Sequence, residues 1–223
     1  MQGDLQREPV IWRDGVTPVS PRFDDPYFSL AGGLAETRHV FLSGNGLPGR
    51  LRDGFHVAEL GFGTGLNLLA LALAWNGPGR LRFTSFEAFP IAATDMARAH
   101  EVFPETVSVS AELTQHWAEG RRRFLLGGLD VEIVIGDARL TLPAWSGQAG
   151  AWFLDGFSPA RNPELWSDDL MPEVARHTTQ GGTFATYTAA GRVRRALQAA
   201  GFQVERVEGF GRKRHMTRGT LAA

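Results

Sequence analysis

The fold is decided by residues 56–65, His56-Val57-Ala58-Glu59-Leu60-Gly61-Phe62-Gly63-Thr64-Gly65, which lead into the apolar run Leu66-Asn67-Leu68-Leu69-Ala70-Leu71-Ala72-Leu73-Ala74-Trp75. The pattern is a short apolar strand with an acid near its end, a turn with glycines at alternate positions, and a helix. Glycine adopts backbone angles that other residues avoid, and it leaves no side chain where the chain passes against a ligand. This order of elements predicts a site for a nucleoside-bearing cofactor.

The spacing of the glycines separates two classes of cofactor. A dinucleotide fingerprint, G-x-G-x-x-G, needs its third glycine at position 66, which is Leu66. The observed spacing of Gly61, Gly63 and Gly65 after Glu59 instead resembles the first motif of class I S-adenosylmethionine-dependent methyltransferases. A tight turn that binds no ligand is the alternative, so the motif needs support from the rest of the chain.

Length and composition limit the remaining possibilities. The chain has 223 residues, 43% of them hydrophobic, which suits one well-buried domain. A net charge of -1 does not predict a generally basic, nucleic-acid-binding surface, and the absence of cysteine excludes disulfides and thiolate metal sites. The apolar run at 66–75 is shorter than the roughly 20 residues that span a bilayer, and the N-terminus has no apolar signal core. We therefore expect a soluble cytoplasmic protein without membrane contact.

Two regions are expected along the chain. Residues 1–55 are rich in proline, glycine and aspartate and lack sustained periodicity, which predicts an N-terminal cap or lead-in packed on the core. Within them, residues 34–42 are predicted to form a helix that stops at Gly44-Asn45-Gly46. Residues 56–223 are predicted to form a Rossmann-like α/β domain.

Strands and helices are expected to alternate in this second region. After the first strand and helix, further strands are predicted at 81–87, 131–138, 151–155, 182–188, 202–207 and 215–221, and helices at 91–103, 111–128, 163–178 and 191–200. Alternation predicts a seven-stranded, mostly parallel sheet covered on both faces. The short link between the last two strands predicts an antiparallel edge strand.

Four acids fall at the ends of predicted strands, namely Glu59, Glu87, Asp137 and Asp155. Ligands of such sheets bind beyond the carboxyl ends of the strands, so the four side chains are expected to converge. Glu87 follows Gly65 by 22 residues, the spacing at which an acid accepts hydrogen bonds from ribose hydroxyls; an ordinary surface carboxylate is the alternative. In the methyltransferase interpretation, Asp137 is the candidate acceptor for the adenine amino group.

Several longer segments resemble the methyltransferase domain of the MnmC family, and together they span nearly the whole chain. They are Thr17-Pro18-Val19-Ser20, Phe23-Asp24-Asp25-x-Tyr27-Phe28-Ser29, Glu36-Thr37-Arg38-x-Val40-Phe41-Leu42, Gly61-Phe62-Gly63-Thr64-Gly65-Leu66-Asn67, Phe153-Leu154-Asp155-Gly156-Phe157-Ser158-Pro159-Ala160-x-Asn162-Pro163-x-Leu165-Trp166 and Gly209-Phe210-Gly211-Arg212-Lys213-Arg214. The resemblance implies a class I, Rossmann-like methyltransferase. It would use S-adenosyl-L-methionine to methylate the aminomethyl group of the tRNA wobble uridine, giving 5-methylaminomethyl(-2-thio)uridine.

The resemblance also implies partners and cofactor contacts. Bifunctional members continue into a flavin-dependent oxidase, whereas this sequence ends at Ala223, so we expect neither flavin nor metal here. The aminomethyl substrate would come from a separate oxidase or an upstream tRNA-modifying enzyme. Asn67, in the glycine motif, is expected to bind the cofactor, and the segment that holds Asp25 and Tyr27 is expected to close over it; a purely structural cap is the alternative.

The acceptor half of the site is expected around Asp155, at the end of the fourth strand. An alkylamine is largely protonated at neutral pH, so something must favour the free amine or take its proton. Asp155 is the candidate, because its carboxylate can accept a hydrogen bond from the N–H group, aim the lone pair and receive the proton. The same carboxylate raises the pKa of the amine, which opposes deprotonation, so orientation is its first expected role and proton acceptance its second. Phe157 is the candidate for stacking on the flipped base, with core packing as the alternative; core packing is preferred for Trp166.

Local basic clusters are expected to bind the anticodon stem-loop of tRNA. The substrate-binding candidates are Arg212, Lys213 and Arg214, with Arg192, Arg194 and Arg195 as further phosphate contacts unless they only form a solvated helix face. The triple arginine at 121–123 is expected to be such a solvated face. Two other functions stay open: a methyltransferase for a small-molecule amine, and a cofactor-binding or tRNA-binding module without turnover.

Overall fold

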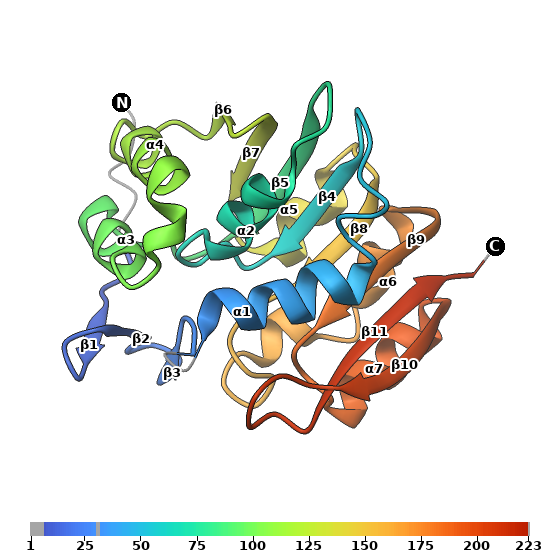
Figure 1. Cartoon of the computed structure of the whole chain (residues 1–223). Helices are drawn as coiled ribbons and strands as arrows, with labels where there is room; N and C mark the ends of the chain where they lie inside the picture. The colour runs from blue at the N-terminus through green and yellow to red at the C-terminus, as the bar shows by residue number, and fades with distance from the viewer. Residues whose placement is uncertain (1–6, 30–31, 223) are drawn as a thin grey trace.

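The computed structural model of the protein describes residues 7–29 and 32–222. Within them, an eight-stranded sheet has the order β10-β11-β9-β8-β4-β5-β7-β6 (Figure 1). Its strands are β4 (His56–Leu60), β5 (Leu81–Glu87), β6 (Arg123–Leu126), β7 (Leu129–Ile135), β8 (Ala149–Leu154), β9 (Thr178–Thr186), β10 (Phe202–Glu208) and β11 (His215–Leu221). Neighbours run parallel from β7 to β9, whereas β6, β11 and β10 pair antiparallel. The predicted α/β fold with a mostly parallel sheet and an antiparallel edge is confirmed.

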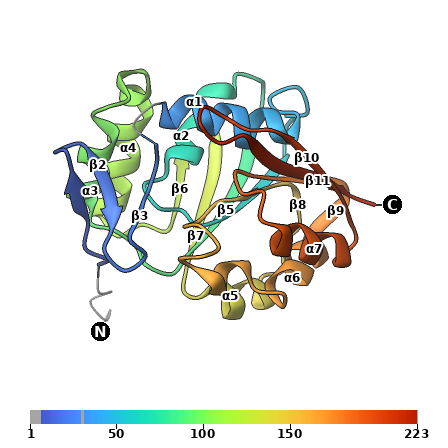
Figure 2. The same ribbon diagram turned by 90° about the horizontal axis from the view of Figure 1, so that it is seen from below.

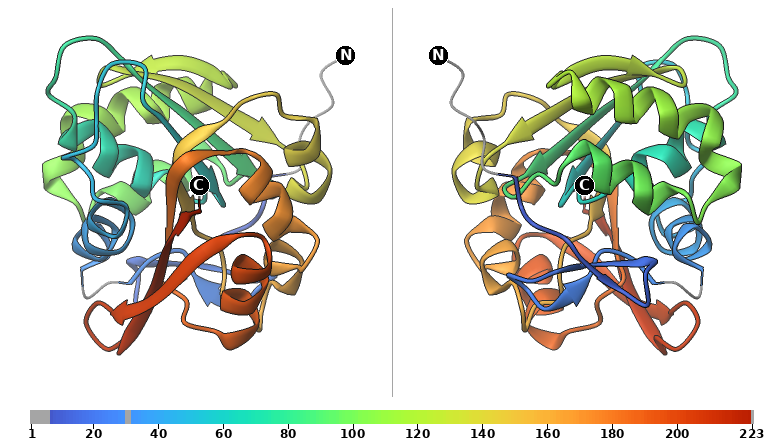
Figure 3. Two further views of the ribbon diagram at one scale, coloured as in Figure 1. Left: turned by 90° about the vertical axis from the view of Figure 1, so that its right-hand side faces the viewer. Right: turned by 90° about the vertical axis from the view of Figure 1, so that its left-hand side faces the viewer.

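Helices cover both faces of the sheet, as Figures 2 and 3 show from below and from the side. One face carries α1 (Gly33–Thr37), α2 (Leu66–Ala74), α3 (Ala93–His100) and α4 (Val107–Ala118), and the other carries α5 (Ala138–Ala144), α6 (Leu170–Arg176) and α7 (Gly191–Ala199). Two apolar cores result, because successive side chains of a strand point to opposite faces. Val57 and Phe153 belong to the first core, and their neighbours Ala58 and Trp152 to the second.

The predicted helix over 111–128 is wrong in its second half. Helix α4 ends at Ala118, and Gly120, with φ of 73°, turns the chain into β6. Phe124 and Leu126 are buried while Arg123 and Leu125 are exposed, so this short segment has the period of a strand. It adds an eighth strand to the predicted seven. The arginines at 121–123 therefore lie in a turn and at the start of β6, not on a helix face.

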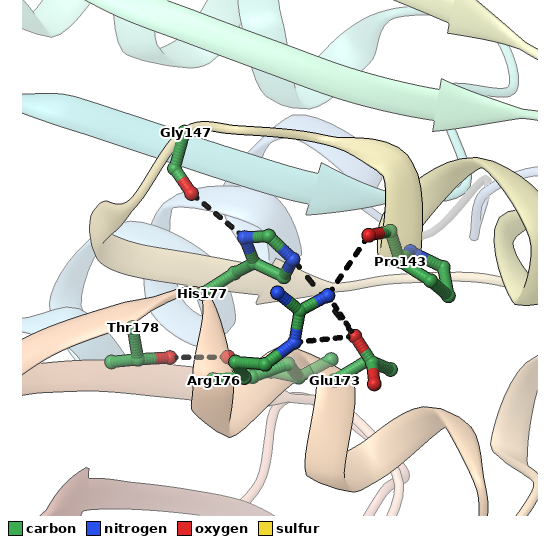
Figure 4. Close-up of polar contacts among 7 residues, drawn as sticks. Pro143, Gly147, Glu173, Arg176, His177 and Thr178 are labelled. Carbon is green, nitrogen blue, oxygen red and sulfur yellow. Dashed lines mark hydrogen bonds and ion pairs between the residues drawn. The ribbon is translucent and has the colours of Figure 1, made fainter.

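The predicted helix over 163–178 is also divided. A 3-10 turn (Pro163–Trp166) precedes α6, and Thr178 already belongs to β9. Side chains hold the junction between α6 and β9 to the segment that follows α5 (Figure 4). The ring Nδ1 of His177 lies 2.7 Å from the carbonyl oxygen of Gly147, and Arg176 Nη2 donates to the carbonyl oxygen of Pro143 at 3.0 Å. These contacts tie the end of α6 to α5 and to the segment that leads from α5 to β8.

The N-terminal region contributes a small sheet and part of the main core. Strands β1 (Ile11–Arg13), β2 (Thr17–Ser20) and β3 (Asp25–Pro26) form an antiparallel sheet beside α3 (Figure 2). The helix predicted at 34–42 is present as α1, and it continues through a π-helical turn (Arg38–Leu42) into a 3-10 turn (Ser43–Asn45). Its apolar side chains are part of the first core. The division of the chain at residue 55 stays a prediction.

Candidate active site

The glycine turn joins β4 to α2 at the carboxyl ends of the central strands. Gly61, Gly63 and Gly65 all have positive φ, at 87°, 53° and 78°. A Cβ atom at Gly61 would collide with the carbonyl oxygen of Asp155, so the first glycine permits the close approach of the ends of β4 and β8. The Asp155 amide donates to the carbonyl oxygen of Leu60 at 3.0 Å, which closes this junction.

A cavity of about 1010 Å³ opens beside this turn. Ten of the predicted site residues line it: Asp25, Tyr27, Gly61, Gly63, Asn67, Glu87, Asp137, Asp155, Phe157 and Lys213. Four others, Glu59, Gly65, Arg212 and Arg214, are not among its lining residues. The strand ends, the N-terminal segment and the β10–β11 turn are thus brought to one place.

Glu87 supports the glycine turn directly. Its carboxylate accepts hydrogen bonds from the Gly63 amide at 2.9 Å and the Phe89 amide at 2.6 Å. Burial raises the pKa of Glu87, and these backbone donors oppose that rise because they favour the ionised form. The carboxylate therefore holds the turn in shape at the wall of the cavity.

Asn67 connects two carboxyl groups. Its amide nitrogen donates to Glu59 Oε1 and to Asp155 Oδ2, at 2.8 Å in each case. Glu59 is fully buried behind the turn, also accepts from the Ser85 hydroxyl at 2.6 Å, and has a pKa raised well above its ordinary value by burial. Glu59 thus orients Asn67 from behind the cavity wall.

Asp155 has the most unusual carboxyl group on the cavity surface. Burial raises its pKa to about 7, although the Asn67 amide, the Lys213 ammonium and the Gly156 amide all favour the ionised form. The Gly156 amide donates to Oδ1 at 2.9 Å, while Oδ2 faces Asn67. A carboxyl group with a pKa near neutrality can take up or release a proton under ordinary conditions.

Asp137 lies in a different electrostatic setting. Both of its carboxylate oxygens contact the Arg139 guanidinium at 2.6 to 3.1 Å, and Oδ1 caps α5 by accepting from the Arg139 amide. These hydrogen bonds to Arg139 lower the pKa of Asp137, so it is ionised at neutral pH. Arg139, which the sequence interpretation did not single out, also lines the cavity.

Aromatic side chains form part of the cavity wall, and the Tyr27 ring lies against Gly63 of the glycine turn. Phe157 stacks on Phe23 with ring centroids 4.7 Å apart, and the Tyr27 ring meets it edge-on at 5.0 Å. Asp25 accepts a hydrogen bond from the Ser158 amide at 2.8 Å, which fastens the N-terminal segment to the loop after β8. Trp166 is 1% exposed and donates to the Phe157 carbonyl oxygen at 2.8 Å, which confirms core packing for this side chain.

The basic residues of the β10–β11 turn separate into two groups. All three side chains are exposed, but Lys213 lines the cavity, pairs through Nζ with Glu36 at 2.7 Å and lies 4.1 Å above the Tyr187 ring centroid, whereas Arg212 and Arg214 are not among the lining residues. On α7, Arg192 and Arg195 are exposed and Arg194 is half-buried. Glu36 and Tyr187 were not assigned roles from the sequence. Tyr187 follows the carboxyl end of a parallel strand, and Glu36 lies in a segment that resembles the MnmC family, so both signals were present.

Residues 104–222, more than half of the chain, match a protein family described as S-adenosyl-L-methionine-dependent methyltransferase. The chain belongs to this methyltransferase family. Its fold, with the cavity at the carboxyl ends of the strands beside a glycine turn, is the arrangement in which open α/β sheets bind ligands.

Relatives of this methyltransferase are tRNA 5-methylaminomethyl-2-thiouridine biosynthesis bifunctional proteins MnmC. The protein from Caulobacter sp. (strain K31) is 47% identical over 95% of the present chain, and that from Caulobacter vibrioides is 46% identical over 92%. The methyltransferase spans less than two fifths of these proteins, 38% and 37% of their lengths. The crystal structure of MNMC2 from Aquifex aeolicus superposes with a TM-score of 0.77 at 28% identity, covering 98% of this chain and 72% of that one.

No helix in the described part of the methyltransferase has the length and apolar character that crossing a bilayer requires.

Proposed function

We propose that this methyltransferase transfers a methyl group to the aminomethyl nitrogen of 5-aminomethyl(-2-thio)uridine at the tRNA wobble position, forming 5-methylaminomethyl(-2-thio)uridine. The names of the Caulobacter relatives and the likeness to MNMC2 support this acceptor. The observation that carries the chemistry is Asp155, a carboxyl group with a pKa of about 7 on the wall of the cavity, bonded through Asn67 to the core. A preceding tRNA-modifying reaction must supply the aminomethyl group.

The cavity fits S-adenosylmethionine. Gly61 and Gly63 line it without side chains, which leaves room for a ligand. The Glu87 carboxylate also lines it and is fixed by the hydrogen bond from the Gly63 amide. We assign the glycine turn, Asn67 and Glu87 to cofactor binding, with Asp137 near the adenine and the segment of Asp25 and Tyr27 closing over it. When bound, S-adenosylmethionine supplies a methyl group on a positively charged sulfur, an already activated donor. The protein therefore mainly has to orient the acceptor, which contributes up to about 7–11 kcal/mol.

Glu59 and Gly65 act indirectly in this proposal. Glu59 is fully buried and outside the cavity lining, so it positions Asn67 instead of touching the cofactor. Gly65 is the N-cap residue of α2 and has a left-handed backbone, a conformation that favours glycine. Both residues preorganise the turn before ligands bind.

Asp155 is assigned to the acceptor amine. Its carboxylate would accept a hydrogen bond from the amine N–H group and direct the nitrogen lone pair toward the methyl group. It would take the proton that the nitrogen gives up as the N–C bond forms and the bond between that methyl group and sulfur breaks, with the neutral thioether leaving. An ordinary aspartate is too weak a base for an alkylammonium, and the pKa of about 7 brings Asp155 closer to the operating pH. General-base help of this kind contributes about 10²- to 10⁴-fold in rate.

The acceptor base is assigned to the aromatic wall and the basic turn. A wobble base has to be splayed out of the anticodon loop before it reaches a pocket, and Phe157 offers a ring that Phe23 already holds in place. Arg212 and Arg214 are exposed at the β10–β11 turn, where they are available to phosphates of the anticodon stem-loop.

The test is to incubate the protein with labelled S-adenosylmethionine and tRNA that bears the aminomethyl wobble uridine, and then to analyse the nucleosides. We expect label in 5-methylaminomethyl(-2-thio)uridine. A panel of free amines, run in parallel, tests whether the acceptor is a small molecule. Calorimetry of cofactor binding tests whether the protein binds S-adenosylmethionine without catalysing transfer. Label in a free amine but not in the tRNA would overturn the proposal, as would cofactor binding without any transfer.

A further inference from the structure

Lys213 is set apart from the two arginines beside it. Its ammonium lies 2.7 Å from Glu36 Oε1 and 4.1 Å above the centre of the Tyr187 ring, and it lines the cavity. The Lys213 side chain is 46% exposed, and Arg212 and Arg214 are exposed as well, but the two arginines lie outside the cavity lining. The Glu36 side chain is only 12% exposed, so it is a fixed anchor and not a mobile surface partner. The Lys213 ammonium is thus engaged by Glu36 and by the Tyr187 ring where it lines the cavity.

A chain of contacts leads from Lys213 to Asp155. Beneath the ammonium, the Tyr187 hydroxyl donates to the Gly156 carbonyl oxygen at 2.6 Å, and Gly156 follows Asp155 directly. The attraction of the Lys213 ammonium lowers the pKa of Asp155, against the larger rise caused by burial. The other charged or titratable groups around Asp155 and Tyr187 are Glu36, which raises the pKa of Asp155, and Asp25, with Glu59 behind the glycine turn and Glu87 on the cavity wall. Lys213 is the cation in this acidic group that lowers the pKa of Asp155.

We propose that Lys213 is a positioning residue: its ammonium, held by Glu36 against the Tyr187 ring, favours the ionised form of Asp155 and disfavours the protonated form of an amine acceptor bound beside it. The inference rests on the proposed function and names the charge state of the acceptor that the site selects. A neighbouring cation lowers the pKa of an amine, whereas a carboxylate raises it. Lys213 therefore offsets the effect by which Asp155 alone would hold the acceptor in its unreactive, protonated form.

The first experiment needs no substrate. The carboxyl resonance of Asp155 is titrated by carbon NMR in protein labelled at aspartate, with Asp155→Asn to assign the signal. In Lys213→Met the pKa of Asp155 rises above the parent value, and in Lys213→Arg, which keeps the charge, it stays near it. Arg206→Met is the matched control, because Arg206 is an exposed cation on β10 outside the cavity lining. An unchanged titration in Lys213→Met overturns the proposal.

The second experiment measures kcat against pH with the aminomethyl tRNA and saturating S-adenosylmethionine. Without the ammonium, both Asp155 and the acceptor amine need a higher pH to reach their reactive forms, so the profile of Lys213→Met moves to higher pH. At pH 7 its kcat falls about tenfold, the effect of one pKa unit, and the rate recovers as the pH rises. Lys213→Arg and Arg206→Met keep the parent profile.

The outcomes separate the two proposals. If the parent protein does not methylate this tRNA, the proposed function fails, and the Asp155 titration still decides the role of Lys213. If the parent is active and Lys213→Met loses rate equally at every pH, Lys213 is only structural and the inference is wrong.

Discussion

Replacement of Asp155 by asparagine is expected to abolish most of the activity while making the fold more stable at alkaline pH. Asparagine has nearly the same shape, but it cannot take up a proton. We expect kcat to fall by about 10²- to 10⁴-fold, the range for loss of a general base. S-adenosylmethionine binding should be retained, because the glycine turn and Glu87 are untouched.

The stability effect follows from the pKa of Asp155. Burial raises it from 3.8 to about 7, so the folded state holds a proton that the unfolded chain has released between those values. Folding stability therefore falls as the pH rises through this window, by about 4 kcal/mol once the pH exceeds 7, and by less than half of that at pH 5. The asparagine variant does not lose this stability, because its side chain does not titrate.

One hydrogen bond offsets part of the gain. The carboxylate accepts from both Asn67 and the Gly156 amide, and asparagine offers only one acceptor oxygen. The lost bond costs about 1–3 kcal/mol, which leaves a net gain of about 1–3 kcal/mol at pH 8 and little or none at pH 5. For a domain of this size, each kcal/mol corresponds to about 2–4 °C in melting temperature.

The assay compares thermal unfolding and single-turnover methyl transfer of Asp155→Asn and the parent at pH 5 and pH 8. Asp130→Asn is the matched control, since Asp130 is an exposed carboxylate at the start of β7 whose partner is Arg80. Turnover within about threefold of the parent, with cofactor binding intact, would refute the base assignment. A stability difference that is the same at both pH values would refute the burial argument.

Three further perturbations test the rest of the site. Glu59→Gln still offers hydrogen-bond partners to the Asn67 amide and the Ser85 hydroxyl, so its free energy of unfolding in denaturant should stay within about 1 kcal/mol of the parent value. Glu59→Ala should lose about 2–5 kcal/mol of that free energy. Gly61→Ala should fail to fold or lose about 3 kcal/mol or more, because its Cβ collides with backbone; Gly54→Ala, also at positive φ but with open space around it, should lose only about 1 kcal/mol by the same measurement. Arg212→Ala and Arg214→Ala should each reduce the slope of log tRNA affinity against log salt by about 0.7–0.9 in filter binding, and an unchanged slope would remove that residue from the interface.

Local sequence patterns were sufficient to predict the structure wherever that structure depends on residues within one element and its adjoining turn. The glycine turn and the strand-end acids were predicted because parallel strands align their carboxyl ends and β–α turns have a fixed geometry. The helix predicted over 111–128 is wrong at β6. Only two buried positions, Phe124 and Leu126, alternate with exposed ones there, and so short an alternation is not distinguished from the helical pattern that precedes it. Only the pairing of β6 with β7 makes a strand of this segment.

The sequence by itself determined the fold class, the glycine turn and the position of Asp155, because these depend on residues that lie close together along the chain. Tertiary structure alone decided that Glu59 lies behind the turn, that Asp137 pairs with Arg139, and that Glu36, Tyr187 and Lys213 converge beside Asp155. Glu36 and Lys213 are 177 residues apart, and no periodicity spans that distance. Their meeting, and with it the charge balance around Asp155, depends on how the layers pack around the sheet.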